Sequence, residues 1–272
     1  MRRAVVIAAI LVSPMVARAN PRTLPFTYTT DTLASGSAEL EQFVDLVPLR
    51  AISASSTREE TYLAFALQTE LEIGLTDRLE LGLYITVVPD PGVALAGAAR
   101  FPGAGNGLKQ RLRYRLHDKP DTIPIVGNAA GYLELSENLF EIEAEGKLIL
   151  ERRMDPVRVA ANLTAEYEWY FSGEREVVLA PSVGVSYEIK PSLHLGLEGW
   201  MRGEFQRPAP ASPTFGLRPQ VYVGPTMMLA VGRVWWTLGL YGRVTEMNHH
   251  MAPGDPYGRV WLRSMIGYDL SR

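Results

Sequence analysis

The amino-acid sequence predicts an all-β fold, a twelve-stranded antiparallel transmembrane β-barrel with short periplasmic turns and longer outer loops. Apolar and polar residues alternate with a period of two along most of the chain, which is typical of strands with one apolar face. Short and long connections separate these runs, as in outer-membrane barrels. The apolar positions hold no Asp, Glu, Lys or Arg, although 21% of the chain is charged. A charge facing lipid at mid-membrane costs about 2–4 kcal/mol, which accounts for this absence.

Residues 1–19 have the pattern of a secretory signal peptide. Arg2 and Arg3 precede the apolar run Ala4–Val16, and an A-x-A cleavage site ends at Ala19. The run is too short for a membrane anchor. Its removal takes away three arginines and no acidic residue, so the formal net charge changes from −3 to −6. An acidic exported chain argues against nucleic acid as a partner.

The next segment, residues 20–36, is polar and Thr-rich and has no long alternation. We expect it to be a periplasmic lead-in, followed by the outer-membrane barrel in residues 37–272. The barrel should be built from twelve alternating runs. In chain order they are Ala38–Val47, Tyr62–Ile73, Leu79–Val88, Leu108–Leu116, Ile123–Leu135, Leu139–Glu151, Val157–Tyr170, Glu176–Glu188, Leu193–Glu204, Gln220–Val231, Val234–Thr245 and Gly258–Leu270.

The second and third runs show the strand pattern most clearly. Leu71 and Ile73 fall on one face, and Glu70 and Glu72 fall on the other. The short Gly/Asp turn 74–78 then leads into a second alternating run, which predicts a hairpin. Two other runs contain a proline, Pro181 or Pro225. Proline removes a ladder donor, so each predicts a bulge or a shifted strand boundary.

The connections predict how the barrel is oriented. Those at 74–78, 190–192 and 232–233 are short, whereas those at 89–107 and 206–219 are long. Since outer-membrane barrels have short periplasmic turns, both termini should lie in the periplasm. Aromatic residues on the apolar face lie near strand ends, as expected of rings at the membrane surface. This predicted aromatic girdle comprises Tyr114, Tyr167, Trp169, Tyr187, Trp236 and Tyr268.

The polar face holds the candidate functional residues. One strand carries four cations in a row and the next strand but one carries carboxylates, about 10 Å away across the strand between them. Long side chains can bridge this gap, so the wall is either a charged surface that selects solutes or an internal salt-bridge lattice that rigidifies the barrel. This predicted wall is Lys109, Arg111, Arg113, Arg115, Glu141, Glu143 and Glu145. Further lumen candidates are Glu70, Glu72, Trp200, Arg202, Trp261 and Arg263.

Three stretches carry a resemblance to a known family: PFTYTTDTLASGSAELEQ at 25–42, GLTDRLELGLY at 74–84 and KQRLRYRLHDKPD at 109–121. In them the sequence resembles a family of uncharacterised bacterial outer-membrane β-barrel proteins. The resemblance implies a porin-like transport role in the outer membrane of a Gram-negative bacterium. It supplies no catalytic residues.

We therefore expect a narrow passive channel for small solutes or ions, in contact with outer-membrane lipid. The carboxylates on the inward face predict a weak preference for cations. Two alternatives remain: a closed structural or surface-interaction barrel without transport, and an integral outer-membrane enzyme. The four histidines occur without a G-x-S-x-G motif, so we predict no catalytic residue, no metal and no cofactor. A secreted β-sandwich with a buried apolar face is the competing fold.

Overall fold

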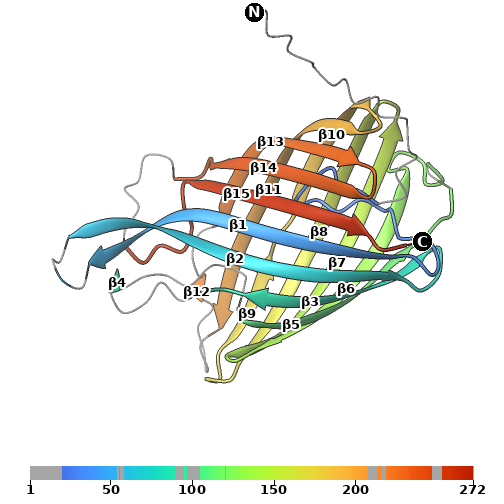
Figure 1. The fold of residues 1–272 in the computed structure, drawn as a ribbon. Coiled ribbons are helices and arrows are strands. Elements are labelled where there is room, and N and C mark those ends of the chain that lie inside the picture. Colours follow the sequence, from blue (N-terminus) through green and yellow to red (C-terminus); the bar gives the residue numbers. More distant parts are fainter. Residues whose placement is uncertain are drawn as a thin grey trace, which may run out of the picture.

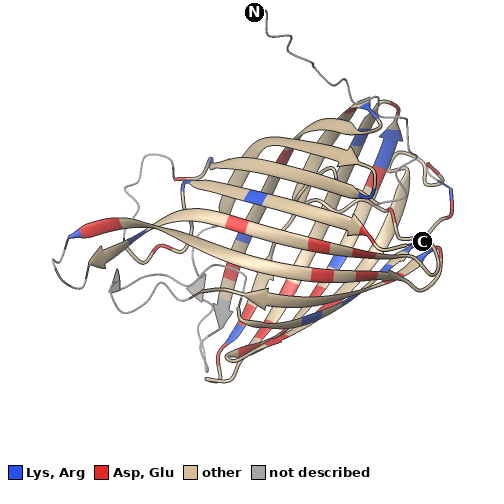
Figure 2. Ribbon diagram, in the orientation of Figure 1, with Lys and Arg blue, Asp and Glu red and all other residues tan. Residues whose placement is uncertain are grey.

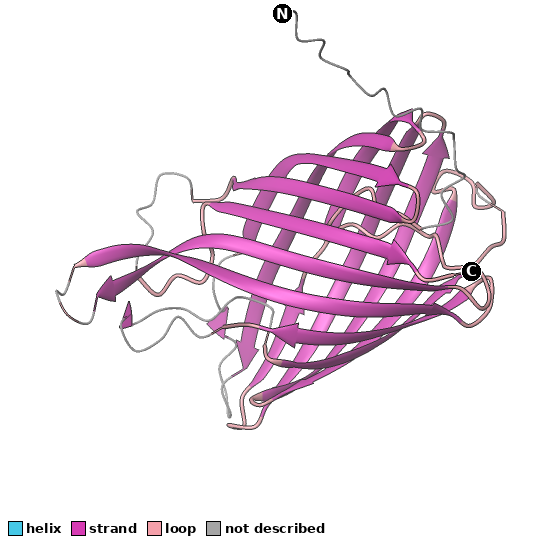
Figure 3. Cartoon of the chain, viewed as in Figure 1, coloured by secondary structure: helices cyan, strands magenta, loops and turns pink. Residues whose placement is uncertain are grey.

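The computed structural model describes residues 20–53, 55, 58–89, 95–96, 105–119, 121–207, 214–215, 219–246 and 253–271, and all of its regular elements are β-strands (Figure 3). Among the described residues, no helix has the length and apolar character needed to cross a membrane. The strands are β1 (Ala38–Ser53), β2 (Glu59–Gly74), β3 (Leu79–Val87), β4 (Leu95–Ala96), β5 (Gly107–Arg115), β6 (Asn128–Asn138), β7 (Glu141–Met154), β8 (Val157–Tyr170), β9 (Arg175–Leu179), β10 (Ser182–Lys190), β11 (Leu193–Arg207), β12 (Thr214–Phe215), β13 (Gln220–Val231), β14 (Val234–Arg243) and β15 (Val260–Asp269).

The strands form one closed antiparallel barrel (Figure 1). Each long strand pairs with its neighbours in the chain, and β1 pairs with β15 to close the sheet. Both β9 and β10 lie between β8 and β11, so they are two parts of one barrel strand. With the two-residue strands β4 and β12 set aside, the barrel has twelve strands, which confirms the predicted fold.

The two faces of the sheet differ as the alternation predicts. On the outside, Leu133 is 67% exposed and Leu163 is 58% exposed. On the inside, Glu39 and Glu41 are fully buried. An apolar exterior around a polar interior is the arrangement of a membrane barrel and the reverse of a soluble β-sandwich. The competing sandwich prediction is therefore wrong.

The barrel has two distinct ends. We call the end with both the start of β1 and the end of β15 the turn end, because the short turns 75–78, 155–156, 191–192 and 232–233 lie there. The connection 116–127 at the turn end is longer and is an exception. The opposite, loop end carries the other long connections, together with the short connections 139–140 and 171–174. There β1 and β2 extend beyond the other strands (Figure 1). Their ladder continues to Ile52 and Glu59, so both strands are longer than predicted.

Two further differences from the predicted runs have a local cause. The fifth run begins at Asn128, not at Ile123, because Ile123 and Gly127 form an isolated bridge around a tight turn in which Ile125 has a φ of 72°. Pro181 interrupts the eighth run and separates β9 from β10. Pro225 stays inside β13, with its backbone opposite Leu197. The predicted signal peptide, residues 1–19, lies outside the described residues.

Candidate functional site: the barrel lumen

Residues 20–36, which we call the plug segment, lie inside the barrel. We expected this segment to be a periplasmic lead-in, but Leu24, Thr27 and Thr30 are fully or almost fully buried. The segment crosses the turn-end half of the lumen and then joins β1 (Figure 1). The expectation failed because the segment has no secondary-structure period of its own and is held by side chains of the wall.

The backbone of the plug segment donates hydrogen bonds to lumen carboxylates and an amide. Phe26 and Thr27 donate from their backbone N–H groups to Glu198. The Asn162 side chain forms a two-way pair with Tyr28, accepting from its N–H at 2.7 Å and donating to its C=O at 2.9 Å. Buried backbone groups must be satisfied, and here wall side chains replace a strand ladder. Thr30 donates in the same way to Glu151, and Leu33 to Glu80.

A recess in the wall receives the first apolar side chain of the plug segment. A Cβ at Gly184 would lie 2.7 Å from Leu24 Cδ1, and one at Gly196 would lie 3.3 Å from Leu24 Cδ2. These two glycines occupy neighbouring strands, β10 and β11: Gly184 pairs with Glu198, and Gly196 pairs with Ser186, two residues along the ladder. Their missing side chains leave the space that Leu24 fills, so the wall and the plug segment are complementary in shape.

The plug segment also contributes to a stack of aromatic rings. Phe26 stacks on Trp200 with ring centroids 4.4 Å apart, and Trp200 stacks on Tyr222 at 4.3 Å. Trp261 meets Trp200 edge-on at 5.0 Å. Aromatic pairs of this kind add about 0.5–1.5 kcal/mol each beyond the area that they bury. The stack therefore fixes the plug segment against β11 and β15.

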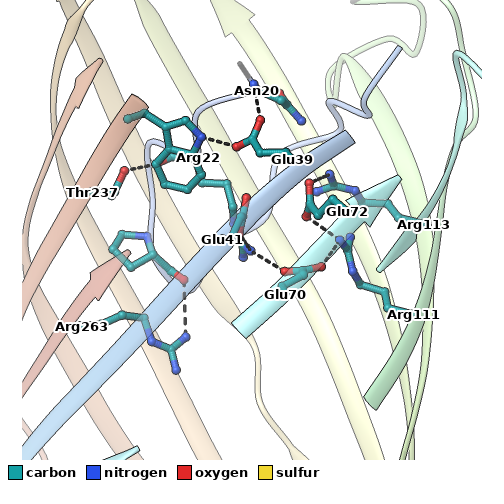
Figure 4. A network of polar contacts seen from close by, with 12 residues as sticks. Asn20, Arg22, Glu39, Glu41, Glu70, Glu72, Arg111, Arg113, Thr237 and Arg263 are labelled. Atoms are coloured by element: carbon teal, nitrogen blue, oxygen red, sulfur yellow. Dashed lines mark hydrogen bonds and ion pairs between the residues drawn. The ribbon is translucent and has the colours of Figure 1, made fainter. Parts of the chain in front are cut away.

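An ionic cluster occupies the turn-end half of the lumen (Figure 4). Arg22 of the plug segment lies 3.2 Å from Glu41 and 3.8 Å from Glu70. From the wall, Arg111 contacts Glu70, Glu72 and Glu80. We call this set the buried ionic cluster, and its members are Arg22, Glu41, Glu70, Glu72, Glu80, Arg111 and Arg113.

The buried ionic cluster shows which carboxylates the arginines of the charged wall contact. The sequence allowed Arg111 and Arg113 to bridge across β6 to the carboxylates of β7. Arg113 instead pairs with Glu80 of β3 at 2.7 Å, and Arg111 pairs with carboxylates of β2 and β3. These strands lie on the other side of β5. Tyr28 of the plug segment lies beside both guanidinium groups, with its ring centroid 5.7 Å from that of Arg111 and 5.5 Å from that of Arg113.

Asp31 attaches the plug segment to the opposite wall. It pairs with Arg158 at 2.9 Å and with Arg153. Burial alone would raise the pKa of the Asp31 carboxyl, but Arg158 and then Arg153 stabilise its charged form and hold the pKa below its usual value. Asp31 is therefore ionised at neutral pH.

A cavity of about 180 Å³ lies on the loop-end side of the plug segment, and we call it the vestibule. Phe26 and Tyr28 of the plug segment line it together with inward residues of the wall. Its charged lining includes Lys109, which binds Glu134 at 3.1 Å, and Arg202, which binds Glu166 at 2.7 Å. Asp45, Glu143, Glu145, Lys147 and Arg263 complete the charged residues of the lining.

The remaining predicted residues lie as follows. Trp200, Trp261 and Arg263 line the vestibule. Arg115 points inward at the turn end and donates to the Asp77 carbonyl at 2.7 Å, whereas Glu141 accepts from Asn138 at the loop end. The girdle aromatics all lie on the outward face, near strand ends, and their contact with lipid remains a prediction: Tyr114, Tyr167, Trp169, Tyr187, Trp236 and Tyr268.

Two groups of three carboxylates bring oxygen atoms within 4.8 Å of one another, Glu41 with Glu70 and Glu72, and Glu143 with Glu145 and Glu166. Arginines lie beside the first group, and Lys147 and Arg202 lie beside the second. These cations already supply positive charge, so we assign no metal to either group.

Sequence reasoning missed the residues that hold the plug segment. Leu24, Phe26, Tyr28 and Asp31 belong to a stretch without strand periodicity, and Asn162 is one of many polar residues on an inward face. The available signal was the pair Gly184 and Gly196, since glycines within strands often mark a close backbone or side-chain approach.

Known proteins share this architecture. A model for a family of unknown function (DUF6662) matches residues 138–247. The structure is similar to an outer membrane channel from Pseudomonas putida F1, with a TM-score of 0.55 and 13% identity over 89% of this chain and 98% of that one. It is similar to the NanC porin, with a TM-score of 0.56 and 9% identity over 85% of this chain and 100% of that one. Among curated proteins, no sequence matches. The predicted resemblance to outer-membrane barrels is confirmed, and at these identities it establishes the fold.

Proposed function

We propose that the protein is a passive outer-membrane channel for small solutes or ions, closed on the periplasmic side by the plug segment in the conformation described here. The observation that carries this proposal is the vestibule, a cavity inside a porin-like barrel lined by charged and aromatic side chains. Channel selectivity arises from such rings of side chains. The turn end then faces the periplasm, and residues 1–19 direct export to the outer membrane of a Gram-negative bacterium.

We further propose that the open channel prefers cations weakly. Arg202 is shared among three carboxylates, Glu166, Glu168 and Glu204. Glu143 receives a hydrogen bond from Ser136 at 3.0 Å and forms no ion pair within 4.0 Å among the described residues. The loop-end lumen therefore carries more carboxylates than cations. An excess of one charge in a pore raises the local concentration of the opposite ion.

The competing candidate is a closed barrel without transport. The dense anchoring of the plug segment favours it, because Glu198, Asn162, Glu151 and Glu80 all hold its backbone. Both candidates share the barrel and differ in whether the turn-end half ever opens. We retain the prediction that the protein is not an enzyme. Labelling of the folded protein by a serine-reactive probe would contradict it.

The test is conductance across a planar bilayer, with the purified protein and with a variant that lacks residues 20–33. The deletion removes all but the last three residues of the plug segment and keeps the turn into β1, so we expect discrete conductance steps several-fold larger than those of the full protein. In asymmetric salt, the reversal potential should lean toward cations. A substitution in an exposed turn, Glu174→Gln, serves as the control. If neither protein conducts after its insertion has been verified, the closed barrel is favoured. Strong anion selectivity would contradict the proposed preference for cations.

A further inference from the structure

Glu39 is a buried carboxylate without a cation beside it. It lies near the start of β1 and is fully buried. One of its oxygens accepts a hydrogen bond from the indole N–H of Trp235. The other lies 3.1 Å from the backbone nitrogen of Asn20, the first residue of the plug segment (Figure 4). Among the residues that the structure describes, no cationic side chain comes within 4.0 Å of Glu39. Since a buried charge without an opposite charge is strongly destabilising, this position needs a cation.

The neighbouring strands increase this need. Glu39 pairs with Glu72 of β2 on one side and with Asp269 of β15 on the other. Residues directly opposite one another in an antiparallel sheet share a face, and like charges placed there repel. Of these three carboxylates, Glu72 contacts Arg111. The buried ionic cluster already contains four carboxylates and three arginines, so it has no spare positive charge for Glu39.

The backbone nitrogen of Asn20 becomes a cation when the predicted signal peptide is removed. The A-x-A pattern ends at Ala19, so a signal peptidase hydrolyses the bond between Ala19 and Asn20. Water adds across this bond, the new carboxylate leaves with residues 1–19, and the nitrogen of Asn20 becomes a free amine. An α-amino group has a pKa of about 7.7–8.0, so most of it is protonated at neutral pH.

We propose that Glu39 is the binding site for the processed N-terminus: cleavage after Ala19 creates an ammonium group at Asn20 that forms a buried ion pair with Glu39 and holds the plug segment in the lumen. In the uncleaved chain the same nitrogen is a neutral amide that donates to the same oxygen. A hydrogen bond between two charged groups is roughly twice as strong as one between neutral groups. The plug segment is therefore held most firmly in the processed protein.

The ion pair depends on the exact position of the cut. Consecutive Cα atoms are about 3.8 Å apart, so cleavage one residue earlier or later moves the ammonium group away from Glu39 by roughly that distance. The inference rests on the proposed export of the protein and does not depend on conduction. Its first test is the mass of the protein purified from outer membranes. We expect a chain that begins at Asn20, and any other first residue would overturn the proposal.

The second test measures how firmly the plug segment is held. Arg22 is the only Lys or Arg in residues 20–36, and it is 6% exposed, so trypsin can cut after it only when the segment leaves the lumen. If undocking is fast relative to cleavage, the cleavage rate reports the population of the undocked form. A folded chain that begins at Asn20 is compared with one that carries an additional methionine before Asn20. The methionine keeps the amide hydrogen bond to Glu39 but removes the charge from the Asn20 nitrogen.

We expect trypsin to cut the chain with the additional methionine about tenfold faster, because the loss of one charged hydrogen bond corresponds to a factor of ten or more. This comparison needs no substitution in the barrel, and equal cleavage rates would overturn the proposal. Glu39→Gln should accelerate cleavage about tenfold in the chain that begins at Asn20, and less than about threefold in the chain with the additional methionine.

Glu41→Gln is the matched control. It removes a partner of Arg22 and leaves the N-terminus untouched, so it should accelerate cleavage by the same factor in both chains. If Glu39→Gln also has the same effect in both chains, or no effect in either, Glu39 does not bind the ammonium group and the proposal is wrong. These results leave the channel function intact, because conductance is measured separately in the bilayer.

Discussion

Arg111 and Lys109 lie two residues apart on the inward face of β5, yet they belong to different halves of the lumen. Arg111 is fully buried among Glu70, Glu72 and Glu80, under the plug segment. Lys109 binds Glu134 and borders the vestibule, with 15% of its side chain exposed. The same kind of charged row is thus a packed interior at the turn end and part of a cavity lining at the loop end. What separates the two is the plug segment, which packs against the turn-end residues and leaves a cavity on its loop-end side.

The sharpest test of this comparison removes one charge from each half. Arg111→Met leaves three buried carboxylates without their shared partner, and breaking a buried pair in this way costs about 3–5 kcal/mol. Lys109→Met removes one charged hydrogen bond beside a cavity, which costs roughly 1.5–3 kcal/mol. Urea unfolding of the two variants in detergent measures the difference. An equal decrease in the free energy of unfolding for both variants would mean that the two halves are equally packed.

A smaller change tests whether shape closes the turn-end half. Gly184→Val places a side chain where Leu24 now lies, so we expect the plug segment to be displaced and the bilayer conductance to rise several-fold. Gly131→Val is the matched control, since a Cβ at Gly131 meets nothing within 4 Å. If the control raises conductance as much as Gly184→Val, the recess for Leu24 has no role in closure.

The smallest expected effect is a pH response of the plug segment. Because the folded protein lowers the pKa of Asp31, its ion pairs stabilise the closed form above the unfolded pKa of about 3.9. This contribution is lost as the pH falls through the lowered folded-state pKa. Conductance should therefore increase modestly below about pH 4. Asp31→Asn should raise conductance slightly at neutral pH and reduce the further increase in conductance at acid pH. If conductance increases equally at acid pH in this variant, the pH dependence belongs to other groups.

Alternation gave the strand faces correctly because a period of two depends only on neighbouring residues. Glu70 and Glu72 could be assigned to the interior from the sequence alone, and so could Trp200 and Arg202. The partners of Arg111 could not, because the arginine lies between two strands with carboxylates, and the rings around it, Tyr28, Tyr84 and Tyr132, come from segments far apart in the chain. The course of the plug segment could not be predicted from the sequence either, since its contacts are with residues far away in the chain. Thr237, which donates to the Arg22 carbonyl, is 215 positions away.

These long separations carry a consequence for how the barrel is assembled. The plug segment is made first, but its anchors on β7, β8, β11 and β14 are synthesised after it. Contacts across such distances in the chain form slowly, because a long loop must close before they are gained. The plug segment can dock only when the strands that surround it have paired in the correct register. Docking of the plug segment would then be the last event of folding. Protection of this segment from proteolysis would therefore indicate that the C-terminal strands have been correctly inserted.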